Sequence, residues 1–437
     1  MAGACLQCLS KIQFMTSKER FDLTVNHKQP DRLVVDFGST SVTGIHASTI
    51  ENLRKYYGLE NKPVRVTDPY QMLGEVDDEL IEIMGVDAVA ARGRKNGFGF
   101  YNHEPLMEYL TPWGQTVLVP DGFRTTNDEN GDVLMYPEGD TSASPSGRMP
   151  RSSYFFDAII RQKPIVEEEL DPKDNLEEYG LVSDSDLEYW AVTTKKARAT
   201  GKAVVAGLGG TALGDIAHIP GIKLKEPKGI RDITEWYMSI LMRPDYIKAI
   251  FDRQSEIALE NFSRLHKVIG NNVDAVYICG TDFGTQDSTF CAPEQFDDLW
   301  LPYYQRINDW VHENTNWKTF KHSCGAVEPF MSRFIAAGFD IINPVQVNAS
   351  GMDPVHLKKT YGKDLVFWGG GIDTQKTLPY ATPDKVREEV LRLCEIFSKD
   401  GGFVFNTVHN IQANVPVENV VAMVDAIREF NGVSITN

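Results

Sequence analysis

From residue 200 onward, short apolar runs alternate with longer amphipathic stretches. The runs are AVVAGLGG (203–210), DAVYICG (274–280), WKTFKH (317–322), FDIINP (339–344), LVFWGG (365–370) and GFVFN (402–406). The amphipathic stretches include 293–314, 326–337, 383–398 and 416–431. Strands that are apolar throughout are buried on both faces, as parallel strands covered by helices are. This rhythm predicts a (β/α)8 barrel (TIM barrel, class α/β), with a doubly wound sheet as the alternative.

The first 200 residues show a different pattern. DRLVVDFGS (31–39) suits a buried strand, 12–27 suits a first helix, and 45–60 and 70–84 have roughly helical periodicity. Residues 102–160 instead hold β-prone runs, TVLVP and DVLMYP, around an Asn130-Gly131 turn. We expect one barrel domain over residues 1–437, with 102–160 as a β-rich insertion within it.

Composition narrows the functional classes. Lys and Arg total 44 against 61 acidic residues, a formal charge of -17, which argues against a nucleic-acid-binding role. No apolar run of about 18 residues predicts a membrane span, and the N-terminus lacks a signal-peptide pattern, so a cytoplasmic protein is expected. The six cysteines show no disulfide framework. Cys5 and Cys8 form a lone CxxC pair, which we interpret as a reduced tail.

Polar clusters follow five of the expected strands. They are Thr281-Asp282-Phe283-Gly284-Thr285-Gln286, His322-Ser323-Cys324, Val345-Gln346, Ile372-Asp373-Thr374-Gln375 and His409-Asn410-Ile411-Gln412. In a parallel barrel the carboxyl ends of all strands share one face, and that face carries the active site. Five clusters on one face predict an active site there, although any single cluster could be a strand cap.

Three of these residues suit a metal. His322 and Cys324, two positions apart at a strand end, and His409 on the same rim offer two imidazoles and a thiolate, a zinc donor set with one position left open. The alternative is a hydrogen-bonded histidine beside a buried thiol. Asp282 is a fourth ligand or a general base. We assign catalysis to Asp282 and Asp373, and substrate binding to Gln286, Gln346, Gln375, Asn410 and Gln412.

Several motifs resemble the uroporphyrinogen decarboxylase superfamily, and most of all its branch of corrinoid-dependent methyltransferases. They are HSCG, NPVQ, GGIDTQ followed by ATPDKV, and HNIQ followed by VP and ENV. The resemblance covers about 270–431 and, more weakly, KQPDRLVVDFGSTSVTGI and YQMLGEVDDELIEIMGVD. It implies a (β/α)8 barrel. Methyl-transferring members carry zinc on a His-x-Cys pair plus a later cysteine; His322 and Cys324 match the pair, while His409 stands at the later position.

The resemblance implies a zinc-dependent methyltransferase that exchanges a methyl group between a small methylated substrate and the cobalamin of a separate corrinoid protein. We favour demethylation of a methoxylated aromatic, with a pocket built from Phe98, Phe100, Tyr101 and Trp368. The alternative is a metal-free decarboxylase of the uroporphyrinogen type, whose members carry a histidine at the position of His409 but also an RQAGRY segment that this chain lacks. A non-catalytic barrel that only binds a ligand is a third alternative. The sequence leaves open whether the protein forms a homodimer.

Overall fold

Eight parallel strands form the central sheet of the chain, for which a computed structural model describes residues 15–103, 105–209 and 211–433. They are β1 (Val34–Val35), β5 (Ala88–Ala91), β12 (Ala203–Ala206), β13 (Ala275–Cys279), β14 (Lys318–His322), β15 (Ile341–Asn343), β16 (Val366–Trp368) and β17 (Phe403–Phe405). Neighbours follow the chain order, and β1 pairs with β17. Val35 O accepts a bond from Asp87 N at 2.8 Å, which brings β1 to the start of β5. The predicted (β/α)8 class is confirmed.

The barrel interior is filled by side chains from alternate strand positions. It includes Val34, Ala88, Ala203, Val205, Ala275, Phe320, Ile341, Val366, Trp368 and Val404. Phe21 and Val25 of α1 (Ser17–Val25) join this cluster. Thr24 O accepts a bond from Gly402 N, just before β17, so α1 closes the end of the barrel where the strands begin. The loops that follow the strands lie at the other end of the barrel.

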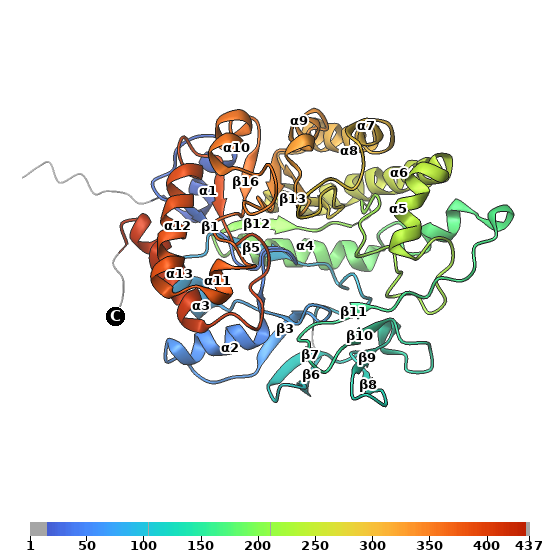
Figure 1. The fold of residues 1–437 in the computed structure, drawn as a ribbon, viewed down its shortest axis with the longest axis horizontal. Helices are drawn as coiled ribbons and strands as arrows, with labels where there is room; N and C mark the ends of the chain where they lie inside the picture. Colours follow the sequence, from blue (N-terminus) through green and yellow to red (C-terminus); the bar gives the residue numbers. More distant parts are fainter. Residues whose placement is uncertain (1–14, 104, 210, 434–437) are drawn as a thin grey trace, which may run out of the picture.

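Helices surround the sheet (Figure 1). They are α2 (Ala47–Tyr56), α3 (Asp78–Met84), α4 (Asp184–Arg198), α5 (Ile233–Met242), α6 (Pro244–Ile269), α7 (Pro293–Leu299), α8 (Leu301–Asn314), α9 (Met331–Ala336), α10 (Pro354–Tyr361), α11 (Thr377–Tyr380), α12 (Pro383–Phe397) and α13 (Val417–Phe430). In α12 the buried residues recur every three or four positions, so one stripe faces the sheet. Within the part of the chain that the structure describes, no helix combines the length and apolar character that a membrane crossing requires.

Two smaller sheets lie beside the barrel, with β6 to β11 grouped below it in Figure 1. The first has the order β2 (Ile45–His46), β4 (Leu73–Gly74), β3 (Val64–Asp68), β7 (Thr116–Pro120) and β6 (Leu106–Leu110). The second has the order β11 (Asp157–Ala158), β10 (Gly147–Met149), β9 (Val133–Met135) and β8 (Thr125–Asn127). The β-rich region therefore recruits residues 45–74 as well as residues from 102–160.

The hairpin between β8 and β9 holds the Asn130-Gly131 pair in its turn. Asp128 N donates to Asp132 O at 2.9 Å and Gly131 N donates to Asp128 O at 3.0 Å, so three residues, 129–131, form the loop. Gly131 adopts a φ of 81°, the left-handed conformation that closes such a loop after a type I turn.

Two expectations for the first 100 residues differ from the structure. The helix expected over 70–84 begins only at Asp78, because Asp68 Oδ1 accepts bonds from Tyr70 N and Gln71 N and so stabilises a turn instead. Strand β5 was not anticipated, since its sequence AVAA is short and rich in alanine. The first helix, α1, begins at Ser17; Cys5, Cys8 and the start of the range expected for that helix lie outside the described residues.

Candidate metal centre

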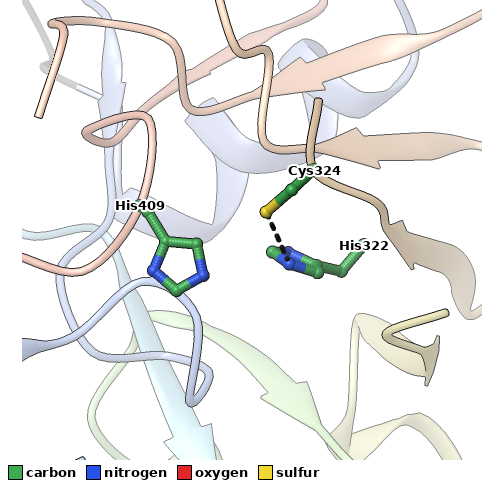
Figure 2. A group of neighbouring side chains, drawn as sticks. All are labelled: His322, Cys324 and His409. Atoms are coloured by element: carbon green, nitrogen blue, oxygen red, sulfur yellow. Dashed lines mark hydrogen bonds between the residues drawn. The ribbon is translucent and has the colours of Figure 1, made fainter. Parts of the chain in front are cut away.

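Two imidazoles and a thiol meet above the strand ends (Figure 2). His322 is the last residue of β14, Cys324 follows it by two positions, and His409 lies in the loop after β17. One ligand atom from each lies within 4.8 Å of the others. His322 Nε2 and Cys324 Sγ are 3.4 Å apart. The structure thus brings together the three residues that the sequence assigned to a metal.

The loop that carries Cys324 is held by backbone hydrogen bonds to its neighbours. Cys324 N donates to Asp282 Oδ1 at 2.7 Å, and Gly325 N donates to Gln346 Oε1 at 2.8 Å. Gly325 has a φ of 92°, and a Cβ there would lie 2.4 Å from the backbone of Gly284. Only glycine fits at this position, because both the conformation and the close approach exclude a side chain.

Asn343, at the end of β15, orients His322. Its Oδ1 accepts the Nδ1–H of His322 at 2.6 Å, and its Nδ2 donates to Trp368 O at 2.9 Å. The imidazole proton is therefore on Nδ1, and the Nε2 lone pair faces Cys324. Metal-binding histidines are typically held in this way by an oxygen on the other ring nitrogen. Asn343 was not predicted as a site residue, although it stands in the NPVQ motif.

His409 has the opposite arrangement. Asn410 N donates to its Nδ1 at 2.8 Å, so the neutral ring carries its proton on Nε2. Figure 2 shows a ring nitrogen of His409 directed towards His322 and Cys324, and the two imidazole centroids are 5.5 Å apart. To ligate a metal through Nε2, His409 must move its proton to Nδ1 and give up the bond from Asn410.

Burial sets the protonation of the three groups. It lowers the pKa of His322 and of His409 to about 4, so both imidazoles are neutral near pH 7 and offer lone pairs. Burial, reinforced by the charge of Asp282, raises the pKa of the Cys324 thiol well above its ordinary value. A divalent cation deprotonates a coordinating thiol, which reverses this preference. Two neutral imidazoles and a thiol fit zinc, with His409 requiring the proton shift.

The two carboxylates assigned to catalysis have different surroundings. Asp282 lies beside the centre, and burial raises the pKa of its carboxyl while the bond from Cys324 N opposes that rise. Asp373 Oδ1 accepts bonds from Gln375 N at 2.6 Å and Lys376 N at 3.2 Å, so it caps the turn before α11. Asp282 therefore borders the three-residue cluster through its bond to Cys324 N, whereas Asp373 supports a loop.

A fully buried lysine lies under the centre. Lys321 Nζ donates to Thr281 O at 2.5 Å and also to His322 O, and it lies 5.2 Å from the ring centroid of Phe283. These bonds tie the end of β13 to the end of β14. Lys321 is a second residue near the site that the sequence analysis did not single out, because it lies inside a strand run.

Three of the side chains assigned to substrate binding, Gln286, Gln346 and Gln375, use their amide groups in hydrogen bonds within the protein. Gln346 Nε2 donates to Gln286 Oε1 at 2.8 Å, and Gln286 Nε2 donates to Asn348 O at 2.6 Å. Gln375 Oε1 accepts a bond from Asn348 Nδ2 at 3.1 Å. With Gln346 also bound to Gly325 N, this chain of amides positions the loop of Cys324.

In the loop after β17, the side chain of Asn410 is fully hydrogen-bonded. Its Oδ1 accepts from Gly44 N at 2.6 Å, and its Nδ2 donates to Ser41 O and to Gln71 Oε1 at 2.8 Å. Gln412 contributes its backbone carbonyl, which accepts from Thr49 Oγ1 at 3.1 Å. Asn410 therefore joins the loop of His409 to the loop after β1, and a buried amide with these bonds has little left for a ligand.

The four aromatic residues expected to form a pocket occupy separate environments. Trp368 belongs to the barrel interior, where its Nε1 donates to Asp36 Oδ2 at 2.9 Å. Phe98 stacks on Tyr70 with ring centroids 4.9 Å apart, Phe100 is buried in the main core, and Tyr101 is exposed. Aromatic side chains more often pack in a core than line a ligand site, and here packing accounts for Trp368, Phe98 and Phe100.

Parts of this chain are similar in sequence to known uroporphyrinogen decarboxylases. The uroporphyrinogen decarboxylase of Ruthia magnifica subsp. Calyptogena magnifica is 28% identical over 196 residues, 43% of this chain and 50% of that protein. The uroporphyrinogen decarboxylase of Psychromonas ingrahamii is 40% identical over 80 residues, 18% of this chain and 22% of that protein. The chain thus spans half or less of the length of these two relatives.

Among solved structures, a methyltransferase from Methanosarcina mazei matches with a TM-score of 0.53 and 16% identity, over 96% of this chain and 99% of that one. At this identity the likeness shows a shared fold. The family description "Uroporphyrinogen decarboxylase (URO-D)" matches residues 162–430, more than half of the chain, including the strand ends that carry His322, Cys324 and His409. By this match the chain belongs to the uroporphyrinogen decarboxylase family.

Proposed function

We propose that this protein is a zinc-dependent methyltransferase, which moves a methyl group from a small methylated substrate to the cobalamin of a separate corrinoid protein. The observation that carries the proposal is the convergence of His322, Cys324 and His409 within 4.8 Å above the strand ends. Of the substrates, a methoxylated aromatic is the one we favour. A histidine-cysteine-histidine set with an open fourth position is a catalytic rather than a structural zinc arrangement.

The residues of the chain have distinct tasks in this proposal. Bound zinc would act as a Lewis acid on the heteroatom that loses its methyl group. His322 is pre-oriented by Asn343 for ligation, and Cys324 is held by the bond from its backbone N–H to Asp282. The Asp282 carboxylate lies next to the reacting region and would orient the substrate. In such a transfer the old bonding pair would stay on the heteroatom, and the reduced corrinoid of the partner protein would supply the electron pair of the new bond to the methyl group.

The test combines metal content with activity. Purified protein should contain about one zinc per chain, and Cys324→Ser should lose it, because a hydroxyl is a poor zinc ligand at neutral pH. Methylation of a reduced corrinoid protein is then measured with methoxylated aromatic, methylthio and methylamine compounds. Zinc-free wild-type protein with full turnover would contradict the proposal.

One observation favours a second candidate, a metal-free decarboxylase. The bond from Asn410 N to His409 Nδ1 leaves a proton on Nε2, so the ring offers a hydrogen-bond donor rather than a lone pair to the site. A neutral imidazole of this kind can polarise a substrate without any metal. Carbon dioxide release from a carboxylated substrate by Cys324→Ser protein that lacks zinc would select this candidate.

A further inference from the structure

A short basic run interrupts this acidic chain directly after β5. It contains Arg92, Arg94 and Lys95, whereas the whole chain has a formal charge of -17. Arg94 pairs with Asp186 at 2.8 Å and Lys95 pairs with Glu138 at 2.9 Å. These two side chains therefore have acidic partners on the surface.

Arg92 differs from both neighbours. Its Nη2 donates to Gly38 O at 3.1 Å, and among the described residues no carboxylate lies within ion-pair distance of its guanidinium. A guanidinium has five N–H donors and keeps its charge in proteins. Arg92 is half-buried and lines a surface cavity, which gives the nitrogens that make no hydrogen bond access to a ligand.

Three acids, Glu75, Asp68 and Asp36, act on Arg92 through their charge, and the carboxylates of Asp36 and Asp68 are already hydrogen-bonded elsewhere. Asp36 accepts bonds from Ser39 and from Trp368 Nε1. Asp68 accepts bonds from Tyr70 N and from Gln71 N and Nε2. These carboxylates stabilise the cation at longer range without using its N–H groups.

The free side of Arg92 lines a small cavity that opens to solvent between β3, β6, β7 and the segment after β5. Arg65, Thr67, Glu75, Tyr101 and Asn102 line it as well. Arg65 Nη2 donates to Asn102 O at 2.5 Å, while its Nη1 lies 3.8 Å from Glu75, too far for a hydrogen bond. The cavity therefore presents two guanidinium groups, two hydroxyls, an amide and the carboxylate of Glu75, so its charged groups carry one net positive charge.

We propose that this cavity is a binding site for a small oxyanion, the carboxylate or phosphate group of a ligand, with Arg92 as its main contact. A planar guanidinium with free N–H groups binds such an anion through two parallel charge-assisted hydrogen bonds. Because Arg92 follows a barrel strand, the site lies at the same end of the barrel as His322 and His409. The proposal does not depend on zinc or on methyl transfer.

Titration calorimetry of the full-length protein in a low-salt buffer, with inorganic phosphate and with benzoate as probes, tests this site. We expect the wild-type protein to bind at least one probe and Arg92→Met to bind it about tenfold to a hundredfold more weakly. Arg92→Lys should recover part of the affinity, because it restores the charge but not the two-point contact. The matched control Arg94→Met removes the same charge two residues away, outside the cavity lining, and should stay within about twofold of the wild type.

Each outcome decides the proposal. Binding of phosphate alone assigns the site to a phosphate group, and binding of benzoate alone assigns it to a carboxylate. Equal losses in Arg92→Met and Arg94→Met would reduce the effect to general surface charge and overturn the site. So would unchanged affinity in Arg92→Met, or a wild-type protein that binds neither probe. Thermal melts of the three variants verify that each is folded, which we expect since Arg92 makes one hydrogen bond.

Discussion

The amide oxygen of Asn343 accepts the Nδ1–H of His322 at 2.6 Å, and this bond fixes which imidazole nitrogen faces Cys324. Asn343 ends β15 and His322 ends β14, and the two residues are paired neighbours in the sheet. The orientation of the candidate ligand is thus set by strand register rather than by a mobile loop. A ligand held in this way loses little freedom when it binds a metal.

Asn343→Leu should weaken zinc binding about tenfold to a hundredfold, because His322 loses the acceptor that fixes its proton on Nδ1. Asn343→Asp keeps an oxygen at this position and should retain most of the affinity. Competition titration with a chromophoric zinc chelator measures both. Equal affinities for wild type and Asn343→Leu would show that the bond does not serve metal binding.

Asp282→Asn should retain zinc but lose turnover. The asparagine Oδ1 can still accept the bond from Cys324 N, so the loop keeps its shape, while the negative charge beside the centre is removed. Metal analysis and the methylation assay, run on the same preparation, separate the two effects. If zinc is lost as well, Asp282 is a ligand and the open coordination position has to be reassigned.

Gly325→Ala should destabilise the fold by about 2–4 kcal/mol, since its Cβ would meet the backbone of Gly284 and Thr285 at a position that also needs a positive φ. Gly85→Ala is the matched control: Gly85 has a φ of 67° at the end of α3, but nothing lies within 4 Å of the added Cβ. We expect that control to cost about 1 kcal/mol. Urea denaturation compares the two, and similar losses would mean that the close approach contributes nothing.

The barrel and the convergence of His322, Cys324 and His409 were accessible from the sequence because both depend on local patterns. Continuously apolar runs indicate buried strands, and polar residues directly after such strands lie together at one end of a parallel barrel. His322 and Cys324 were found from spacing within one loop. His409 could be added because it follows another strand of the same sheet.

The role of each rim residue was not accessible in the same way. Asn410 and Gln346 are polar residues after strands, just as His409 is, yet their amides turn out to hold neighbouring loops. Whether a polar group faces a ligand or a backbone N–H depends on loop contacts between residues far apart in the chain, such as Gly44 with Asn410. Asn343 was missed for the same reason, because its partner His322 is 21 residues away.

The last prediction concerns the stability of the fold at acid pH. It involves His46, which is fully buried and lies far in sequence from His322, Cys324 and His409. Its Nε2 donates to Tyr154 O at 3.0 Å, and its Nδ1 accepts a bond from Ser48 N as the cap of α2. Burial lowers the pKa of His46 to about 4, whereas an unfolded histidine titrates near 6.5. Between these values the unfolded state binds more protons than the folded state, so the free energy of unfolding rises with pH in this window. The contribution is complete above about pH 6.5 and is lost as the pH falls to 4.

Replacing His46 removes its pH-dependent contribution to the free energy of unfolding. His46→Asn keeps a capping side chain at the start of α2, so the variant should fold, although with lower stability at pH 7. The difference in unfolding free energy between pH 7 and pH 5 should be smaller in the variant by about 2 kcal/mol. Urea denaturation of zinc-free protein at the two pH values measures it, and the contributions of His322 and His409, which have the same sign, cancel in the comparison. Identical pH dependence in the two proteins would mean that His46 is protonated in the folded state at pH 5, against the burial that excludes its charged form.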